Sequence, residues 1–200
     1  MKYRLLPIAL LVVMILSACQ TYSMPTLPPT AVPVPTATSD PSAPTAMPVS
    51  ADLPAWYKIP FINVANEQEI KIEDFLGKVI MFEPMAGWCG TCFAQQTIVK
   101  QLHDKMGMRD DFMSISLDVD LNTRSSAVKQ YAELSGFDWT FGQTNADLSR
   151  ELSALYGDQF INPPSAPMLI IDKQGEAHLL PFGGVRQLDE LEKILEPYLQ

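Results

Sequence analysis

The sequence is most informative about the fold in the run Val79-Ile80-Met81-Phe82-Glu83-Pro84-Met85-Ala86-Gly87-Trp88-Cys89-Gly90-Thr91-Cys92. This run begins with apolar residues, typical of a buried strand over 78–82, and its Cys-x-x-Cys opens an amphipathic run that predicts a helix over 90–105. Two cysteines at this spacing can close a small disulfide ring, and a helix N-terminus favours the thiolate of Cys89. Because a thiolate is the species that attacks disulfides, the stretch indicates thiol–disulfide exchange.

The Cys-x-x-Cys spacing also occurs in zinc sites, which require four ligands. Outside the pair, the chain offers only Cys19, His103 and His178 as further cysteine or histidine ligands. We expect both histidines to be surface residues, one on the helix that follows the cysteines and one after a turn. Asp118 and Asp120 follow a predicted strand, where two acids usually form a solvated loop rather than a cation site. The sequence therefore predicts a redox pair, with no metal and no cofactor.

The N-terminus is typical of a bacterial export signal. Residues 1–18 combine two basic residues with an apolar stretch that is shorter than the ~20 residues needed to span a bilayer. Leu16-Ser17-Ala18-Cys19 resembles the lipobox of bacterial lipoproteins, in which the cysteine is lipidated and becomes the first residue of the mature chain. We predict a signal peptide over 1–18 and an extracytoplasmic protein anchored to a membrane through a lipid on Cys19. The alternative is an ordinary secretory signal.

The composition changes abruptly after Cys19. Between this residue and Pro54 the chain has nine prolines among Thr, Ser, Ala and Val, and only two charged residues. Such a segment cannot build a core, and we predict an extended, polyproline-like tether over 19–54 that reaches on the order of 100 Å. A single globular domain is predicted to follow over 55–200.

The charge and the cysteine count exclude other classes of protein. Removal of residues 1–18, which takes away two basic residues and no acidic one, changes the formal net charge from −9 to −11. A chain this acidic has no electrostatic attraction to nucleic acid or to anionic lipid headgroups. After lipidation of Cys19, only Cys89 and Cys92 remain as thiols, which suits an exported redox protein rather than a scaffold with structural disulfides.

The rest of the domain alternates between strand-like and helix-like stretches. Short strands are predicted at 59–64, 69–72, 112–117, 168–171 and 177–180, and helices at 123–134, 145–155 and 187–199. Asn145 is the predicted N-cap of its helix. The order is strand–helix–strand, a helical insertion, and then two strands and a helix. This order predicts an α/β fold, with a mixed central β-sheet flanked by helices on both faces and an N-terminal strand extension.

With these features the chain resembles the thioredoxin superfamily, and most closely the membrane-tethered, exported thioredoxin-like proteins of the TlpA type. The resemblance covers residues 59–199 and includes Gly77-Lys78, the run from Trp88 to Cys92, Ala166-Pro167, and Gly183-Gly184 before the last helix. It implies the thioredoxin fold. It also implies thiol–disulfide exchange in cytochrome c maturation or related reduction tasks.

The resemblance assigns roles around the cysteine pair. Cys89 is the exposed nucleophile that forms a mixed disulfide with a partner protein, and Cys92, which is more shielded, resolves it. Trp88 shapes the contact surface beside the pair. Pro167 takes the position of the family's cis-proline, and Ala166 offers its backbone to an extended partner peptide. The competing interpretations are a tryptophan that fills the core and a proline-rich loop.

Glu83 is the further candidate at the site. It lies six residues before Cys89, where thioredoxins carry a buried acid. A carboxyl group in an apolar setting has a raised pKa and can exchange a proton with the resolving thiol. The alternative is an ordinary strand-end glutamate in water, since Pro84 follows directly and bends the strand.

We expect an exported thiol–disulfide oxidoreductase that reduces protein disulfides and is kept reduced by a membrane electron donor. Gly90-Thr91 stands where thioredoxin has Gly-Pro, so a disulfide oxidant of the same fold is an alternative. A Sco-like copper chaperone is another, but it would need a wider cysteine spacing and a distal histidine, which 162–167 lacks. A peroxiredoxin would need Thr or Ser where Ala86 stands.

Overall fold

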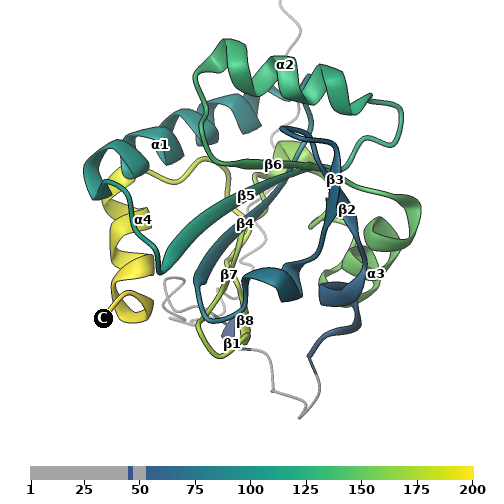
Figure 1. Cartoon of the computed structure of the whole chain (residues 1–200). Coiled ribbons are helices and arrows are strands. Elements are labelled where there is room, and N and C mark those ends of the chain that lie inside the picture. The colour runs from purple at the N-terminus through teal and green to yellow at the C-terminus, as the bar shows by residue number, and fades with distance from the viewer. Residues whose placement is uncertain (1–44, 47–52) are drawn as a thin grey trace, which may run out of the picture. The chain divides into compact units, whose positions relative to one another are not determined.

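A computed structural model describes residues 45–46 and 53–200 of the chain (Figure 1). The strands form one eight-stranded sheet in the order β1-β8-β7-β4-β5-β6-β2-β3. They are β1 (Thr45–Ala46), β2 (Phe61–Asn63), β3 (Gln68–Ile70), β4 (Val79–Met85), β5 (Phe112–Asp118), β6 (Thr140–Gln143), β7 (Leu169–Ile171) and β8 (Ala177–Leu179). The α-helices are α1 (Gly90–Met106), α2 (Ser125–Ser135), α3 (Ala146–Tyr156) and α4 (Leu188–Leu195). Short 3₁₀ helices are η1 (Ala55–Lys58), η2 (Ile72–Phe75), η3 (Pro163–Ser165) and η4 (Glu196–Tyr198).

The centre of the sheet is parallel and its flanks are antiparallel. β4 pairs with β5 and β5 with β6 in parallel, and α1 and α2 make the two connections. β7 runs antiparallel to β4, and β8 antiparallel to β7. The carboxyl ends of the three parallel strands therefore meet at one end of the sheet. The Cys-x-x-Cys follows β4, which is one of the two central strands of the sheet.

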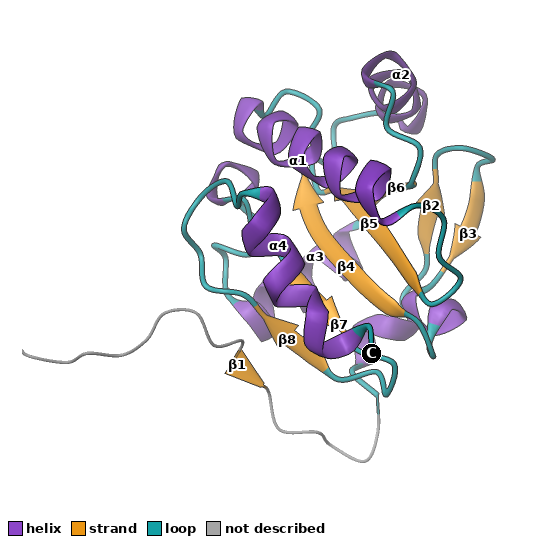
Figure 2. Ribbon diagram, turned by 90° about the vertical axis from the view of Figure 1, so that its left-hand side faces the viewer, coloured by secondary structure: helices purple, strands orange, loops and turns teal. Residues whose placement is uncertain are grey.

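Helices cover both faces of the sheet, and Figure 2 shows α1 and α4 in front of it and α3 behind. On the front face, Met81 of β4 packs in one apolar cluster with Leu102 of α1 and with α4. On the other face, Phe82 of β4 packs with Trp56 of η1 and Leu152 of α3. Alternate residues of β4 thus belong to opposite cores, as expected for a central strand that is buried on both sides.

The observed architecture confirms the predicted fold class. The helix predicted over 90–105 is α1, and Asn145 caps α3 by accepting a 2.9 Å hydrogen bond from the Leu148 amide. β4 continues past the predicted end, through Pro84 to Met85. The Val79 N–H and the Met85 carbonyl both bond toward the β5 side. Pro84, which has no N–H, therefore faces the β7 side, where pairing has already ended at Phe82.

Two details differ from the sequence prediction. The predicted helical insertion contains strand β6, which pairs with β5 and with β2. Its run Thr-Phe-Gly-Gln contains a glycine and one large buried side chain, Phe141, so it shows no strand periodicity. The last helix is shorter than 187–199, because α4 ends at Leu195 and Pro197 continues the chain in η4.

The predictions for the N-terminus lie mostly outside the described residues. The signal peptide over 1–18, Cys19 and most of the predicted tether over 19–54 lie there. Thr45–Ala46, inside the predicted tether, form β1 and pair with β8. Within the part of the chain that the structure describes, no helix combines the length and the apolar character needed to cross a membrane.

Candidate active site

The Cys-x-x-Cys lies where β4 ends and α1 begins. β4 ends at Met85, and after the loop 86–88 Cys89 forms the N-cap of α1. The Cys89 N–H donates to the Ala86 carbonyl at 2.9 Å, which closes the loop. Cys89 and Cys92 form a disulfide with their Cα atoms 5.3 Å apart. The ring that the spacing allowed is therefore closed at the start of the helix.

The start of α1 favours negative charge on Cys89. The backbone N–H of Cys92 donates to Cys89 Sγ at 3.1 Å. The unpaired N–H groups of the first helical turn add a partial positive charge at the same place. Both effects stabilise a thiolate more than a thiol once the disulfide is reduced.

The expected difference in exposure between the two cysteines is not observed. Cys89 and Cys92 are each 4% exposed in the disulfide form. Cys92 Sγ lies 3.4 Å from the carbonyl oxygen of Pro163, an acceptor for the thiol of reduced Cys92. The loop that carries Pro163 thus lies directly against the cysteine pair.

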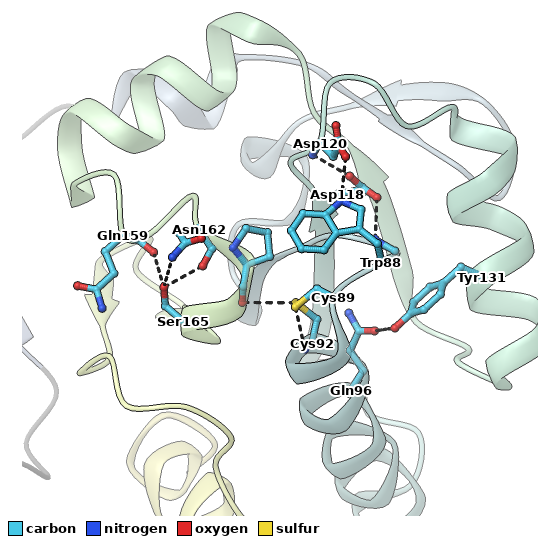
Figure 3. Close-up of a disulfide and its surroundings, with 12 residues drawn as sticks. Trp88, Cys89, Cys92, Gln96, Asp118, Asp120, Tyr131, Gln159, Asn162 and Ser165 are labelled. Atoms are coloured by element: carbon cyan, nitrogen blue, oxygen red, sulfur yellow. Dashed lines mark hydrogen bonds between the residues drawn. A yellow bond between two sulfur atoms is a disulfide. The ribbon is translucent and has the colours of Figure 1, made fainter. Parts of the chain in front are cut away.

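The loop that carries Asn162, Pro163 and Ser165 lies opposite the cysteine pair (Figure 3). Ser165 Oγ donates to the Asn162 carbonyl at 2.9 Å and accepts from Asn162 Nδ2 at 3.2 Å, which holds η3 in place. The resemblance matches Pro167 to the position of the family's cis-proline, but the described residues contain no cis peptide bond. Instead Ala166, in the left-handed conformation with φ 47° and ψ 54°, turns the chain from η3 into β7.

A third segment reaches the site from the C-terminal part of the chain. Gln95, one turn after Cys92 on α1, is buried and bonds to the backbone of Arg186. Its Oε1 accepts from the Arg186 N–H at 2.7 Å, and its Nε2 donates to the Arg186 carbonyl at 3.4 Å. This amide pairing fixes the loop that follows Gly183-Gly184 against α1. A buried glutamine on the active-site helix was not predicted from the sequence.

Trp88 lies on the surface beside the disulfide. Trp88 is 65% exposed, which contradicts the competing interpretation of a tryptophan that fills the core. Trp88 Nε1 donates to Asp120 Oδ2 at 2.9 Å. Phe93 on α1 and Leu121, next to Asp120, are also exposed. Exposed aromatic and aliphatic side chains near a disulfide suit contact with a partner protein.

Glu83 is buried on the α1 face of the sheet. It shares the strand periodicity of Met81, whose side chain packs against α1, and it is 5% exposed. Ser116 Oγ, from the paired position on β5, donates to Glu83 Oε1 at 2.5 Å and accepts from Trp139 Nε1 at 2.8 Å. Burial raises the pKa of Glu83 to about 7, against the lowering effects of Ser116 and the Gln96 amide. The alternative of a solvated strand-end glutamate is therefore wrong.

Gln96 and Tyr131 complete the polar cluster beneath the cysteines. Gln96 is fully buried on α1, and its Oε1 accepts from the Tyr131 hydroxyl at 2.6 Å. Its Nε2 has no hydrogen-bond partner among the described residues. Gln96 therefore acts on Glu83 as a nearby dipole rather than through a fully formed hydrogen bond. Burial also raises the pKa of Tyr131, so this hydroxyl stays protonated.

Asp118 is buried, which corrects the expectation of a solvated loop. It is 0% exposed at the end of β5. Its Oδ2 accepts from the Gly87 N–H at 3.3 Å and its Oδ1 from the Asp120 N–H at 2.8 Å. Burial raises its pKa to about 6. Asp120 itself lies at the surface, where hydrogen bonds from Asn122 and Trp88 lower its pKa.

The sequence predicts two surface histidines, but His178 is buried and His103 is half-buried. His103 of α1 stacks on Trp139 with ring centroids 5.3 Å apart, and its Nε2 lies 2.8 Å from Ser114 Oγ. Burial lowers the pKa of His103. His178 is buried, with its Nε2 2.9 Å from Asp172 Oδ2. Ser114 lies in β5, Trp139 directly precedes β6, and Asp172 directly follows β7. The sequence pattern does not reveal these contacts.

One group in the described residues has ligand types for a metal ion, namely Asp172, Glu176 and His178, whose ligand atoms all lie within 4.8 Å of one another. Asp172 already accepts from the Gln174 and Glu176 N–H groups, so it shapes the β7–β8 turn. β7 runs antiparallel to β4, so this turn lies at the end of the sheet opposite the cysteines. The copper-chaperone alternative gains no ligand from it.

Comparison with known proteins shows the fold. No family model and no curated protein sequence matches the chain. A thiol:disulfide interchange protein of the thioredoxin family from Chlorobium tepidum has a TM-score of 0.58 and 19% identity, covering 76% of this chain and 100% of that one. The thioredoxin domain of a Bacteroides vulgatus thiol-disulfide oxidoreductase has a TM-score of 0.56 and 16% identity over 76% and 100%. A secreted disulfide oxidoreductase from Mycobacterium tuberculosis has a TM-score of 0.54 and 12% identity over 70% and 96%.

The chain therefore has the thioredoxin fold, as the sequence resemblance predicted, with a Cys-x-x-Cys pair at the start of α1. The structural neighbours include proteins described as thiol:disulfide interchange proteins.

Proposed function

We propose that the chain is a thiol–disulfide oxidoreductase that reduces disulfides in partner proteins. The observation that carries this proposal is the Cys89–Cys92 disulfide at the start of α1, with the Cys92 N–H directed at Cys89 Sγ. The exposed Trp88 beside it offers a contact surface, and the likeness to thiol:disulfide interchange proteins supports the reaction class.

The reaction takes place in two exchange steps. In the reduced protein, the Cys89 thiolate attacks one sulfur of the partner disulfide, a mixed disulfide forms, and the other partner sulfur leaves as a thiolate that takes up a proton. Cys92 then loses its proton and attacks Cys89 Sγ. The Cys89–Cys92 disulfide closes, and the second partner sulfur leaves and is protonated. Two electrons and two protons pass from the pair to the partner.

Glu83 is the group that we assign to accept the proton of Cys92. Its side chain faces α1, and a pKa of about 7 lets it exchange protons near neutral pH. We assign Ala166 and Pro167 to the wall of the site opposite the cysteines, with the Ala166 backbone pairing with an extended partner peptide. Trp88 supplies apolar contact area beside the sulfurs.

We further propose that the protein is exported and held at a membrane by a lipid on Cys19, with a membrane electron donor that returns the pair to the dithiol. The support is the lipobox-like Leu16-Ser17-Ala18-Cys19 and the proline-rich 19–54. Labelling of the chain with a radioactive fatty acid in a bacterial host, with Cys19→Ser as the control, tests the anchor. Unlabelled wild-type chain would contradict it.

Trapping tests the exchange chemistry. Cys92→Ser should accumulate a mixed disulfide between Cys89 and its partner, visible as a band that disappears on reduction. Cys89→Ser is the matched control and should trap nothing. If neither variant or both variants form such adducts, the assignment of Cys89 as the nucleophile is wrong.

Redox titration against glutathione or dithiothreitol tests the direction of electron flow. A reduction potential of about −270 mV supports a reductase, whereas one of about −120 mV indicates a disulfide oxidant. Titration of the reduced chain with Cu(I) addresses the copper-chaperone alternative. A stable complex with one copper per chain that depends on both cysteines would favour that alternative.

A further inference from the structure

Asp118 is a second buried carboxylate at the site, and the exchange steps above give it no role. It is the last residue of β5 and pairs across the sheet with Met85, the last residue of β4. It therefore lies where β4 leads into the loop 86–88, directly before Cys89.

The two oxygens of Asp118 hold two different segments. Oδ2 accepts from the Gly87 N–H at 3.3 Å, and Oδ1 accepts from the Asp120 N–H at 2.8 Å. Asp120 in turn accepts from Trp88 Nε1 at 2.9 Å. Trp88 is thus tied at its backbone through the preceding Gly87 and at its indole through Asp120. Figure 3 shows Asp118 and Asp120 together at the Trp88 indole, next to Cys89.

Packing alone does not fix the Trp88 side chain. Trp88 is 65% exposed, whereas Trp56 is 1% exposed inside the apolar core. The orientation of an indole with so few core neighbours depends on its polar contacts, and these lead back to Asp118. Because Trp88 directly precedes Cys89 in the chain, the same contacts restrain the backbone that carries the attacking sulfur.

We propose that Asp118 is a positioning residue for thiol–disulfide exchange, because its carboxylate joins the loop before Cys89 to the loop that holds Trp88. This inference rests on the proposed function. If Asp118 only shaped the turn, the bond from the Asp120 N–H to Oδ1 would be sufficient. An asparagine at this position would offer the same oxygen without burying a carboxylate. The bond from Oδ2 instead reaches Gly87, 31 residues away in the chain.

The groups around Asp118 include no paired cation. Asp120 on its own loop acts directly on Asp118, and Tyr131 of α2 lies within electrostatic reach of both Asp118 and Glu83 of β4. The cysteine pair at the start of α1 lies at the same site (Figure 3). Lys129 of α2 donates to the Ala65 carbonyl instead, and Gln143, the β6 residue paired with Asp118, is uncharged. None of the ion pairs among the described residues includes Asp118.

This setting makes the positioning dependent on pH. Burial raises the pKa of Asp118 to about 6 against the lowering effect of its two N–H donors. Once protonated, the carboxyl group is a weaker acceptor and releases Gly87 or the Asp120 loop. Exchange should therefore slow below pH about 6 by more than the loss of the Cys89 thiolate explains.

Exchange rates of the reduced full chain with oxidised glutathione test this inference. Asp118→Asn should lower the second-order rate constant at pH 7 by about tenfold, the effect of one lost hydrogen bond to a charged group. Alkylation by iodoacetamide reports the thiolate at each pH. The ratio of exchange to alkylation should fall below pH about 6 in the wild type and stay flat in Asp118→Asn. Asp147→Asn, an exposed acid on α3, is the matched control and should leave both rates unchanged.

A double-mutant cycle separates positioning from a structural effect. Asp120→Ala removes the indole acceptor, so the effects of Asp118→Asn and Asp120→Ala on the exchange rate should be less than additive. Equal rates for Asp118→Asn and the wild type, or fully additive effects, would overturn the proposal.

Fluorescence of Trp88 tests the same inference without any Asp118 variant. The difference between wild-type and Trp88→Phe spectra gives the Trp88 signal, which should change between pH 5 and 7 in the oxidised chain. A signal that stays constant over this range would also overturn the proposal. If the reduced wild type does not react with oxidised glutathione at all, the proposed function fails, whereas the fluorescence transition still reports whether Asp118 holds Trp88.

Discussion

Ser116 Oγ donates to Glu83 Oε1 at 2.5 Å, and among the described residues it is the group that directly bonds this buried carboxylate. The same oxygen accepts from Trp139 Nε1 at 2.8 Å, so its own proton is directed at Glu83. One neutral donor does not offset the cost of burying a charge. Glu83 therefore holds its proton up to pH about 7.

Glu83→Gln should stabilise the oxidised protein at neutral pH. The folded chain keeps the Glu83 proton up to pH about 7, whereas the ordinary value is 4.5. Between these values the folded state binds more protons than the unfolded state, so the free energy of unfolding falls as pH rises, by at most about 3 kcal/mol for this group. Urea unfolding at pH 4.5 to 8 checks this.

Asp118 titrates in the same direction but at lower pH, from 3.8 toward about 6. The decline in stability between pH 6 and 7.5 should thus disappear in Glu83→Gln, while the decline below pH 6 remains. A wild-type chain whose stability is constant from pH 6 to 7.5 would show that Glu83 is ionised in the folded state.

Ser116→Ala should raise the pKa of Glu83 further, because it removes the donor that favours the carboxylate. It also leaves Trp139 Nε1 without its acceptor, which should cost about 1–3 kcal/mol of stability. The pH at which the decline in stability ends, which follows the pKa of Glu83 in the folded chain, should move above 7. Ser116→Thr, which keeps the hydroxyl group, is the control and should restore the wild-type end point. An unchanged end point in Ser116→Ala would mean that the hydrogen bond does not influence Glu83.

Glu67→Gly should stabilise the β2–β3 turn. Glu67 has φ 60°, in the left-handed region where a side chain costs about 1–2 kcal/mol. The flexibility of glycine in the unfolded chain cancels part of this gain, so the free energy of unfolding should rise by about 0.5–1 kcal/mol. Glu69→Gly removes the same charge from an exposed position inside β3 and should destabilise by a similar amount. If both variants lose stability in chemical denaturation, Glu67 carries no strain.

The sequence predicts the parts of the site that depend on local pattern. The apolar run before Cys89 and the helical run after it place the cysteines between β4 and α1, and the Asn145 cap is equally local. Glu83 was found through its distance from Cys89 along the chain. Its burial depends on Ser116 and α1, which lie far from it in sequence.

Contacts between distant segments account for what the sequence did not predict. From the sequence, Asp118 is predicted to lie in a solvated loop, because its bond from the Gly87 N–H, in the loop after β4, is not visible there. From the sequence, His178 is predicted to be a surface histidine, because its contact with Asp172 forms only when the β7–β8 hairpin brings the two residues together. The backbone before Pro167 follows from how η3 lies against Cys92, which a resemblance of short motifs does not determine.

Strand β6 was also not predicted from the sequence. A glycine is needed at position 142 because of a contact with a residue far away in the chain, and not because of the local backbone. Gly142 pairs with Asn63 and Leu117, and a Cβ added there would lie 2.5 Å and 2.7 Å from two ring carbons of Phe61. Both distances are far inside van der Waals contact, and the Phe61 ring is buried in the core. Gly142→Ala should therefore reduce the free energy of unfolding by about 1–3 kcal/mol.

Gly183→Ala is the matched control for Gly142→Ala, since an added Cβ at Gly183 meets no atom within 4 Å. It should change stability by less than about 0.5 kcal/mol. The double variant Gly142→Ala with Phe61→Leu provides the second check. A smaller side chain at 61 gives the new methyl group room, so the cost of Gly142→Ala should shrink in that background. An equal cost in both backgrounds would show that the methyl group is rejected by the strand backbone and not by the Phe61 ring.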